Sequence, residues 1–508
     1  MPTLQGKLEI ADFDKTIFKN ERVQLHKDII ERVQNSFDFL KEFSENKIIY
    51  GVNTGFGPMA QYKIKDDERI QLQYNLIRSH ASGTGNAIPA EYVRAAMLAR
   101  LNTLSLGNSG VHPSVIKLMG ELLNKDIIPL IYEHGGVGAS GDLVQLAHLA
   151  LVLIGEGEVF YKGERRKTEE IFKIENLEPI KVELREGLAL MNGTSVMTGI
   201  GVVNVLYTKQ IMQWMIKASS AINEIVKAYD DHLSLELNET KMHVGQREIA
   251  EMMRTHLKDS NLTRKREHHL YNGSKNEEVF VEKVQEYYSL RCVPQILGPV
   301  LDTLNSVEKI LIEEVNSAND NPIVDVEKRH VYHGGNFHGD YVSLEMDKLK
   351  IVVAKMTMLA ERQLNYLLNS KLNNILPPFV NLGKLGLNFG MQGVQFTATS
   401  TTAESQMLSN PMYVHSIPNN NDNQDIVSMG TNAALITKKV IENAFEVVAI
   451  ELITIVQAIE YLKVQDSVSS ETKKMYNEIR KIVPVFKEDV VMYPYVNSVK
   501  EFLMDSVK

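Results

Sequence analysis

Long windows of the sequence repeat apolar residues every three or four positions, which is the period of an α-helix. The clearest windows are residues 199–231, 306–314, 348–372 and 437–462. In places the apolar residues cover most of the helix circumference, and a helix of that kind must be buried by other helices. We therefore predict a mainly α-helical protein whose long helices pack against one another, within one chain or between subunits.

Segments with strand character are few and short. Residues 47–52 and 158–161 are rich in β-branched and aromatic residues, and residues 331–338 surround a Gly-Gly pair that is typical of a turn. We expect these three segments to form minor β elements beside the helices.

The window from residue 385 to residue 421 is polar but almost without charge. Glu404 is its only charged side chain when histidine is counted as neutral. Polar groups that are hidden from water are usually hydrogen-bonded, so we expect most of this window to be buried at a subunit interface or in the wall of a site. A solvated, asparagine-rich loop explains residues 419–423 but not the whole window. The window is too polar to span a membrane.

The composition narrows the classes of partner. The chain has 508 residues, with 55 Lys and Arg against 64 Asp and Glu, and a net charge of −9. This acidic balance offers no footprint for a phosphate backbone or an anionic lipid surface, so we expect neither nucleic acid nor a membrane as partner. The single cysteine, Cys292, excludes an intramolecular disulfide and favours a reducing compartment. The first residues lack the apolar core of a secretory signal, so we expect a cytoplasmic protein.

The segment 134–142, HGGVGASGD, is the most unusual in the chain. Three of its glycines match the G-x-G-x-x-G pattern that binds dinucleotides, namely Gly136, Gly138 and Gly141. An apolar run precedes them, and Glu156 lies at about the spacing of the acidic residue that binds the ribose. However, Pro129 interrupts the supposed buried strand, and the rest of the chain does not alternate strands with helices. A nicotinamide-dependent dehydrogenase is therefore only an alternative interpretation.

The tripeptide Ala139-Ser140-Gly141 in this segment indicates a covalent alternative. If the bend brings the amide nitrogen of Gly141 against the carbonyl carbon of Ala139, a five-membered ring can close. Loss of water, including the Ser140 hydroxyl, then leaves an exocyclic methylidene. Only small residues let the backbone approach so closely. A helix that starts near Asp142 would direct its positive end at the ring. A second Ala-Ser-Gly, residues 81–83, is interpreted as a structural turn.

The sequence around the tripeptide, GGVGASGDLVQLAHLAL, resembles the signature of the aromatic amino acid ammonia-lyase family. The resemblance covers nearly the whole chain, and further segments follow in the family's order. These segments are YGVNTGFG from Tyr50, QYNLIRSHASG from Gln73, LMNGTS around Asn192, QEYYSLRCVPQ from Gln285, NSANDNP, GGNFHGD with Phe337, and NNNDNQDIVSMG with Asn420, Asn423 and Gln424. The chain lacks the long extra segment of plant phenylalanine ammonia-lyases and resembles the compact bacterial type. The sequence of its motifs, with RSH and NNNDNQDIVSMG, most resembles tyrosine ammonia-lyases of the Flavobacterium type.

The resemblance implies a fold, a prosthetic group and an assembly. The fold is mainly α and like that of histidine ammonia-lyase, with a long central helical bundle and a smaller α+β N-terminal region that carries the prosthetic-group loop. The implied domains are residues 1–195, with this loop and the catalytic tyrosine loop, and residues 196–508, with the bundle and the oligomerisation surface. The implied prosthetic group is 4-methylidene-imidazol-5-one, formed autocatalytically from Ala139, Ser140 and Gly141 without an external cofactor. The implied assembly is a homotetramer in which residues from three chains complete each site.

The resemblance also implies roles for individual side chains. Tyr50 would remove the β-proton of the substrate, and Tyr288 would be a second catalytic tyrosine near the ring and the amine. An ordinary phenol has a pKa of about 10, so a site that uses one as a base must stabilise its anion. Arg291, on the same predicted helical face as Tyr288, would bind the substrate carboxylate through two hydrogen bonds. Asn192 and Gln285 would bind the prosthetic group and the substrate.

The segment around Phe337 has two further interpretations. The resemblance implies that Phe337 packs beside the ring system, although packing in a hydrophobic core explains an aromatic residue there equally well. Four nearby side chains form a cluster that could hold a metal ion, namely His330, His333, His338 and Asp340. Their spacing matches no common zinc pattern, so we expect no metal site.

Some of the residues expected at the ring of the substrate resemble those of histidine lyases, and others resemble those of tyrosine lyases. Ser79 and His80 form the pair that resembles histidine ammonia-lyases, but those enzymes usually carry a glutamate where this chain has Gln424. The sequence NQDI from Asn423, together with Asn420, instead matches tyrosine and phenylalanine lyases. His80 can exchange a hydrogen bond with a phenol, and a buried polar partner would reject phenylalanine.

We therefore predict the non-oxidative deamination of L-tyrosine to trans-4-coumarate and ammonia. A histidine ammonia-lyase that gives urocanate is the alternative, followed by a phenylalanine lyase or an aminomutase. A non-catalytic helical scaffold, in which the glycine bend is only a helix entry, is a third class of interpretation.

Overall fold

The computed structural model describes residues 3–4, 7–271, 278–280 and 283–505. The chain forms two compact units, and each unit is assembled from three separate segments. Unit 1 comprises Met1–Leu206, Val307–Asp347 and Pro411–Lys438, and unit 2 comprises Tyr207–Ser306, Lys348–Asn410 and Lys439–Lys508. The predicted division into domains 1–195 and 196–508 stays a prediction, and the compact units follow contacts rather than chain order.

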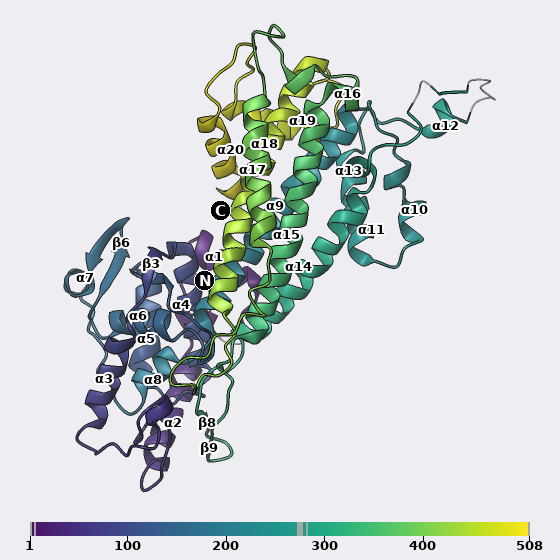
Figure 1. Cartoon of the computed structure of the whole chain (residues 1–508). Coiled ribbons are helices and arrows are strands. Elements are labelled where there is room, and N and C mark those ends of the chain that lie inside the picture. Colours follow the sequence, from purple (N-terminus) through teal and green to yellow (C-terminus); the bar gives the residue numbers. More distant parts are fainter. Residues whose placement is uncertain (1–2, 5–6, 272–277, 281–282, 506–508) are drawn as a thin grey trace. The chain divides into compact units, whose positions relative to one another are not determined.

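Four long helices confirm the helical windows of the sequence. They are α9 (Ser195–Ile225), α14 (Val293–Val315), α15 (Asp340–Leu368) and α18 (Gly430–Leu462). Helix α18 ends before Lys463, whose φ of +55° is not helical. In unit 2, α9 and α15 lie side by side, because Ser219 bonds to Gln363. In unit 1, α9 lies beside α18, because Asn204 bonds to the carbonyl of Ala434 (Figure 1). The apolar faces of these helices are therefore buried by one another.

The shorter helices of unit 1 include one, α4, that is buried on all sides. They are α1 (Ile10–Phe18), α2 (Lys27–Phe43), η1 (Gly57–Met59), α3 (Arg69–His80), α4 (Ala90–Ser105), α5 (Pro113–Asn124), α6 (Leu143–Leu153), α7 (Thr168–Glu175) and α8 (Glu186–Met191). Helix α4 is buried all round from Tyr92 to Ser105, and α1, α2 and α5 pack against it. A second group, α3, α6 and α8, packs together. The ends of these three helices carry most of the residues discussed below.

The shorter helices of unit 2 lie between and after the long ones in the chain. They are η2 (Asp231–Leu233), α10 (Leu235–Glu239), α11 (Val244–His256), α12 (Arg266–His269), α13 (Tyr288–Arg291), α16 (Ser370–Asn373), η3 (Pro378–Val380), α17 (Gln392–Leu408), α19 (Ser470–Ile482) and α20 (Tyr493–Asp505). In the described part of the chain, no helix is both long enough and apolar enough to cross a lipid bilayer.

The strands are short and form small, separate sheets. The pairs are β1 (Thr3–Leu4) with β2 (Gln24–Leu25), β3 (Thr84–Ala87) with β5 (Tyr132–His134), and β8 (Ile323–Asp325) with β9 (His330–Tyr332), and the three-stranded sheet is β4 (Ile128–Pro129), β6 (Glu158–Tyr161) and β7 (Glu164–Lys167). Among the strands of the described residues, only β1 and β2 pair in parallel. The dinucleotide-binding interpretation is therefore wrong, because it requires a parallel sheet around the glycine-rich loop.

Only one of the three strand predictions is confirmed in full. Residues 158–161 form β6 as predicted. Residues 47–52 form a turn instead, because the Asn53 side chain accepts a hydrogen bond from the Ile49 amide and the Val52 amide folds back onto the Ile49 carbonyl. Of residues 331–338, only the first two are in a strand, and the hairpin turns between β8 and β9, before the Gly-Gly pair.

The uncharged window at residues 385–421 is not buried within the chain. Phe389 is 62 % exposed, Phe396 on α17 is 67 % exposed and Ile417 is 65 % exposed. The prediction places this window at a subunit interface or in the wall of a site, and exposure in a single chain leaves it a prediction. Burial of these side chains would require a partner.

Candidate active site

Unit 1 contains a cavity of about 840 Å³ that gathers most of the predicted site residues. The lining comes from the loop after α2, the end of α3, the glycine-rich bend, α8, the loops around β8 and β9, and the turn before α18. The predicted residues in this lining are Tyr50, Ser79, His80, Ser140, Asn192, Phe337, Asn420, Asn423 and Gln424. The mutual packing of α3, α6 and α8 brings three of these residues together, because His80 ends α3, Asn192 follows α8 and Ser140 precedes α6.

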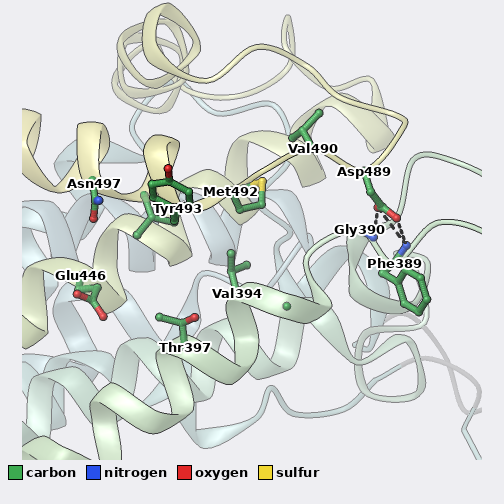
Figure 2. A pocket seen from close by; sticks show the side chains of 12 residues that line it. Phe389, Gly390, Val394, Thr397, Glu446, Asp489, Val490, Met492, Tyr493 and Asn497 are labelled. Carbon is green, nitrogen blue, oxygen red and sulfur yellow. Dashed lines mark hydrogen bonds between the residues drawn. The ribbon is translucent and has the colours of Figure 1, made fainter.

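Unit 2 contains a second cavity, of about 470 Å³, which holds none of the predicted residues (Figure 2). Its two carboxylates already have partners. Asp489 accepts hydrogen bonds from the amides of Phe389 and Gly390 at 2.9 and 3.0 Å. Glu446 accepts one from the Thr401 hydroxyl and lies 3.5 Å from the Lys500 ammonium. The unit 1 cavity is therefore the better candidate for catalysis.

Two positions of the bend that carries Ala139-Ser140-Gly141 must be glycine, namely Gly138 and Gly141. Gly138 has φ of +76° and Gly141 has φ of +72°. A Cβ on Gly141 would lie 1.9 Å from the carbonyl oxygen of Gly193, and a Cβ on Gly138 would lie 2.0 Å from the Ser428 hydroxyl. Both the backbone angle and the space exclude a side chain. The bend therefore lies directly against neighbouring chain segments, with no space for a side chain at either glycine.

Two amide side chains hold Ser140. Asn192 donates from Nδ2 to the Ser140 carbonyl oxygen at 3.0 Å, and Gln424 donates from Nε2 to the Ser140 hydroxyl oxygen at 3.0 Å. Asn192 is 3 % exposed, and its Oδ1 atom is buried with no hydrogen-bond partner in the described residues. A buried acceptor of this kind is costly unless something pairs with it. This atom is therefore free to bind a group formed on the bend, or the substrate.

Asp142 holds the end of the bend in place, a role beyond the helix start that was predicted for it. Its Oδ2 atom accepts hydrogen bonds from the amides of Val196 and Met197 at 2.8 and 2.9 Å, and Oδ1 accepts one from the Thr431 hydroxyl. Its own amide donates to the Gly193 carbonyl at 2.8 Å. Burial raises the pKa of the Asp142 carboxyl to about 6, although these hydrogen bonds oppose the rise.

Several helices begin beside the bend. Asp142 is the N-cap of α6 and binds the first amides of α9. The Gly339 amide, just before α15, donates to the Gly138 carbonyl at 3.1 Å, and the Met429 amide, just before α18, donates to the Val137 carbonyl at 3.0 Å. Helix N-termini carry partial positive charge. The surroundings of the bend therefore favour negative charge.

Tyr50 lies in the turn that replaces the predicted strand. Its hydroxyl oxygen accepts a hydrogen bond from the Gly57 amide at 3.0 Å, and its ring meets the Phe56 ring edge-on with centroids 6.1 Å apart. A backbone amide that donates to a phenolic oxygen stabilises the phenolate more than the phenol. The sequence could not show this contact, because it depends on how the loop closes.

His80 is held in one tautomer by the end of α3. Its Nδ1 atom lies 3.0 Å from the Leu76 carbonyl oxygen and 3.0 Å from the Ser79 hydroxyl oxygen. A carbonyl oxygen can only accept, so Nδ1 carries the hydrogen and Nε2 of the neutral ring keeps its lone pair. His80 therefore offers the cavity a hydrogen-bond acceptor.

The turn at residues 419–424 brings three predicted residues to the cavity. Asn420, Asn421 and Asp422 all have φ near +57°, at +55°, +58° and +59°. Asparagine and aspartate tolerate this left-handed conformation better than other residues with side chains, which explains the Asn-rich sequence. The turn places Gln424 against Ser140, and it places the Asn420 amide where it would meet a Cβ on Gly57 at 2.9 Å.

Five predicted residues are not in the described lining of the cavity: Ala139 and Gly141, which flank Ser140 in the bend, and Gln285, Tyr288 and Arg291. Gln285, Tyr288 and Arg291 belong to unit 2, where they form a cluster of their own. Arg291 donates from Nη1 to Gln285 Oε1 at 2.8 Å, and its guanidinium lies 4.5 Å from the centre of the Tyr288 ring. Tyr288 is 70 % exposed. The helical face that the sequence predicted for Tyr288 and Arg291 is therefore present.

The cavity also contains residues that sequence reasoning did not assign. Leu143 and Leu188 give it apolar walls, and Asn321 and His333 give it polar ones. Asn321 belongs to the segment NSANDNP, so its place in the family order was the available signal. Among the described residues, no three His, Cys, Asp or Glu side chains are grouped so that they could hold a metal ion.

Comparisons with known proteins identify the family of this chain. The model of the family described as aromatic amino acid lyase matches residues 8–481. The chain belongs to this family. It is 38 % identical over 502 residues to a histidine ammonia-lyase of Geobacillus sp. (strain WCH70), covering 98 % of this chain and 95 % of the relative. It is 39 % identical over 466 residues to a tyrosine 2,3-aminomutase of Myxococcus sp. (strain Mx-B0), covering 90 % and 88 %.

Solved structures of the family share the fold. A phenylalanine aminomutase of Pantoea agglomerans superimposes with a TM-score of 0.95 at 32 % identity, covering 100 % of this chain and 99 % of that one. A tyrosine aminomutase of Streptomyces globisporus gives 0.94 at 33 % identity, covering 99 % and 97 %. The predicted fold class is therefore confirmed. The relatives differ in substrate and in reaction outcome, so family membership alone selects neither.

Proposed function

We propose that this protein is an ammonia-lyase that converts L-tyrosine to trans-4-coumarate and ammonia. The observation that carries the proposal is that one cavity is lined by three residues: Ser140 of the Ala139-Ser140-Gly141 bend, Tyr50 and His80. The first residue supports the family's chemistry, and the other two support a β-proton base and a phenol-binding group.

The residues around the bend fit the prosthetic group that the family resemblance implies. Asn192 and Gln424 would hold it, since both already bind Ser140 and the Oδ1 atom of Asn192 is free to bind more. The helix N-termini beside the bend would stabilise negative charge on it. When present, a methylidene-imidazolone supplies an electrophile for the amine of the substrate.

Tyr50 would take the β-proton of the substrate on its hydroxyl oxygen. The hydrogen bond from the Gly57 amide supports this role, because it holds the Tyr50 hydroxyl oxygen in one position at the edge of the cavity. Phe56, which packs against the Tyr50 ring, limits the rotation of that ring. The base would thus be held in place before substrate binds.

His80 supports tyrosine over phenylalanine. A phenolic O–H can donate to the lone pair of Nε2, whereas the ring of phenylalanine has no group that could pair with this acceptor. Gln424 supports tyrosine over histidine, since it stands where the resemblance places a glutamate in histidine lyases. His80 alone does not distinguish tyrosine from histidine, because the N–H group of an imidazole substrate can also donate to Nε2.

A histidine ammonia-lyase is the second candidate. The 38 % identity to a relative of that name and the Ser79-His80 pair both favour it. The tyrosine 2,3-aminomutase relative favours a variant in which ammonia returns to the β-carbon. Both alternatives use the same bend and the same base.

We also propose that the protein acts as a homotetramer. The exposed apolar side chains of the uncharged window support it, because single soluble chains rarely leave such a surface uncovered. The described lining of the cavity supports it too, because it contains no arginine or lysine, and the proposed mechanism needs the cluster of Gln285, Tyr288 and Arg291 for the substrate carboxylate. In a tetramer, those residues would come from a neighbouring subunit.

The deciding experiment incubates the purified protein separately with tyrosine, histidine and phenylalanine. Coumarate, urocanate and cinnamate are followed by absorbance, and β-amino acids are measured by chromatography. We expect coumarate to form fastest and β-tyrosine to be a minor product. Faster urocanate formation would overturn the substrate assignment. A Ser140→Ala variant should lose activity, and its intact mass should lack the loss of water seen in the parent protein.

A further inference from the structure

The short helix α13 ends in a way that leaves one of its carbonyl groups without a helical partner. In a continuous helix, the Leu290 carbonyl would accept a hydrogen bond from the amide of residue 294. Residue 294 is Pro294, which has no N–H group. The side chain of Asn223, on α9, donates to the Leu290 carbonyl instead, at 3.4 Å. A buried side chain therefore completes the helix that carries Tyr288 and Arg291.

A second buried amide holds the neighbouring carbonyl. Gln363, on α15, donates from Nε2 to the Ser289 carbonyl at 2.8 Å. Gln363 is fully buried and also exchanges hydrogen bonds with the Ser219 hydroxyl at 3.0 and 3.1 Å. Asn223 donates to the Ser219 backbone carbonyl at 2.9 Å. The two amides thus form one network anchored on the same turn of α9.

The network continues to His232. The oxygen of the Asn223 side chain accepts a hydrogen bond from His232 Nε2 at 3.1 Å, and this fixes which side of the amide faces Leu290. Burial lowers the pKa of His232 to about 4, so the ring is neutral at pH 7. A neutral ring with hydrogen on Nε2 is the form that can donate to Asn223.

Arg291 depends on the orientation of this helix. Its Nη1 atom donates to Gln285 Oε1 at 2.8 Å and to the Glu286 carbonyl at 2.7 Å, and its guanidinium stacks on Tyr288. Both Tyr288 and Arg291 project from a helix of four residues. Only Cys292 separates this helix from α14, which begins at Val293, and Pro294 removes one of the hydrogen bonds that would join the two. The two amides hold the carbonyls at this junction.

We propose that Gln363 and Asn223 are positioning residues for Arg291, the side chain that binds the substrate carboxylate. They act through the Ser289 and Leu290 carbonyls, and they do not touch the substrate. This inference rests on the proposed function, in which Arg291 binds the substrate carboxylate.

The test uses Gln363→Met and Asn223→Leu, which keep the volume of each side chain and remove its donor. Two competitive ligands are compared, 4-coumarate, which has a carboxylate, and tyramine, which has none. A lost positioning hydrogen bond of about 1.4 kcal/mol corresponds to about a tenfold change. We expect the KM for tyrosine and the inhibition constant of 4-coumarate to rise about tenfold, with tyramine binding and kcat changed about twofold or less.

Gln457→Met is the matched control. Gln457 is also a fully buried glutamine of unit 2 that donates to a backbone carbonyl, that of Phe486, at 3.0 Å. We expect this variant to lower the melting temperature as much as Gln363→Met and to leave 4-coumarate binding unchanged. If Gln363→Met fails to fold, Gln363→Leu replaces it, because it also removes the donor.

The outcomes separate this inference from the function on which it rests. Arg291→Gln should weaken 4-coumarate binding more than either positioning variant. If Arg291→Gln leaves it unchanged, the proposed carboxylate role is wrong. If Arg291→Gln weakens it while the Gln363 and Asn223 variants behave like Gln457→Met, the positioning role is wrong. Equal weakening of 4-coumarate and tyramine would also contradict positioning, because it indicates a general structural loss.

Discussion

The side-chain amide of Gln424 donates a hydrogen bond to the hydroxyl of Ser140 across 3.0 Å, although the two residues are 284 positions apart in the chain. Asn192 binds the carbonyl of the same serine, so Ser140 is held at both its side chain and its backbone. A serine held in this way has little freedom to rotate its hydroxyl away from the bend. Gln424 is therefore in a position to affect both the cyclisation of the bend and the choice of substrate.

Replacing Gln424 should slow the formation of the prosthetic group. Gln424→Leu removes the donor to Ser140, and the loss of one hydrogen bond corresponds to about a tenfold effect. We expect newly made protein to lose water more slowly in intact-mass measurements. Asp425→Asn, at the exposed neighbouring position, is the control and should behave like the parent protein. Gln424→Glu should raise the ratio of urocanate to coumarate; an unchanged ratio would remove this residue from substrate selection.

Replacing Tyr50 should abolish most turnover without disturbing the bend. A general base contributes about 10²- to 10⁴-fold to a rate, so Tyr50→Phe should lower kcat by about that factor while the intact mass still shows the loss of water. Tyr62→Phe, a change at a 69 % exposed tyrosine nearby in the chain, should leave kcat unchanged. Full turnover by Tyr50→Phe would exclude Tyr50 as the base.

Replacing His80 should change which ring the site accepts. His80→Leu removes the acceptor for a phenol, and a buried unpaired polar group costs about 1–3 kcal/mol. We expect the ratio of kcat/KM for tyrosine to that for phenylalanine to fall by about 5- to 150-fold. Ser79→Ala should have a smaller effect, because the Leu76 carbonyl still holds Nδ1 of His80. A ratio that does not move would show that the phenol binds elsewhere.

Glu451 should make the stability of the protein depend on pH. It is fully buried in α18, neither carboxyl oxygen has a hydrogen-bond partner in the described residues, and burial raises its pKa well above the ordinary value. A carboxyl whose pKa is raised by folding stabilises the folded state below its unfolded pKa and loses that contribution as the pH rises. The loss is about 1.4 kcal/mol per pH unit between the two pKa values.

The variant Glu451→Gln has no group to ionise, so it should be more stable than the parent protein by a margin that grows from pH 5 to pH 8. Thermal unfolding at both pH values measures this margin. Glu501→Gln, at an exposed position of α20, should give the same margin at both. A margin for Glu451→Gln that shrinks toward pH 8 would contradict the direction of the pKa shift.

The sequence predicted features that depend on neighbouring residues or on a repeated pattern. The long helices follow from apolar residues at the helical period, and α9, α14, α15 and α18 confirm them with shifts only at their ends. The tripeptide at Ala139 and the helix that starts after Asp142 follow from the glycines around them. The predicted strand at residues 47–52 failed because a single side chain, Asn53, bonds to the backbone and makes a turn more favourable than an extended segment.

Only the tertiary structure decided which distant groups meet. Segments that are far apart in the chain are joined by the hydrogen bonds from Gln424 and Asn192 to Ser140. They are also joined by the hydrogen bonds from the first amides of α9 to the carboxylate of Asp142. Likewise, the tautomer of His80 and the amide donor to Tyr50 depend on how a helix end and a loop close. The physical reason is that residue types and their spacing set local backbone preference, whereas a hydrogen bond requires two atoms within about 3 Å, and packing of the whole unit determines that distance.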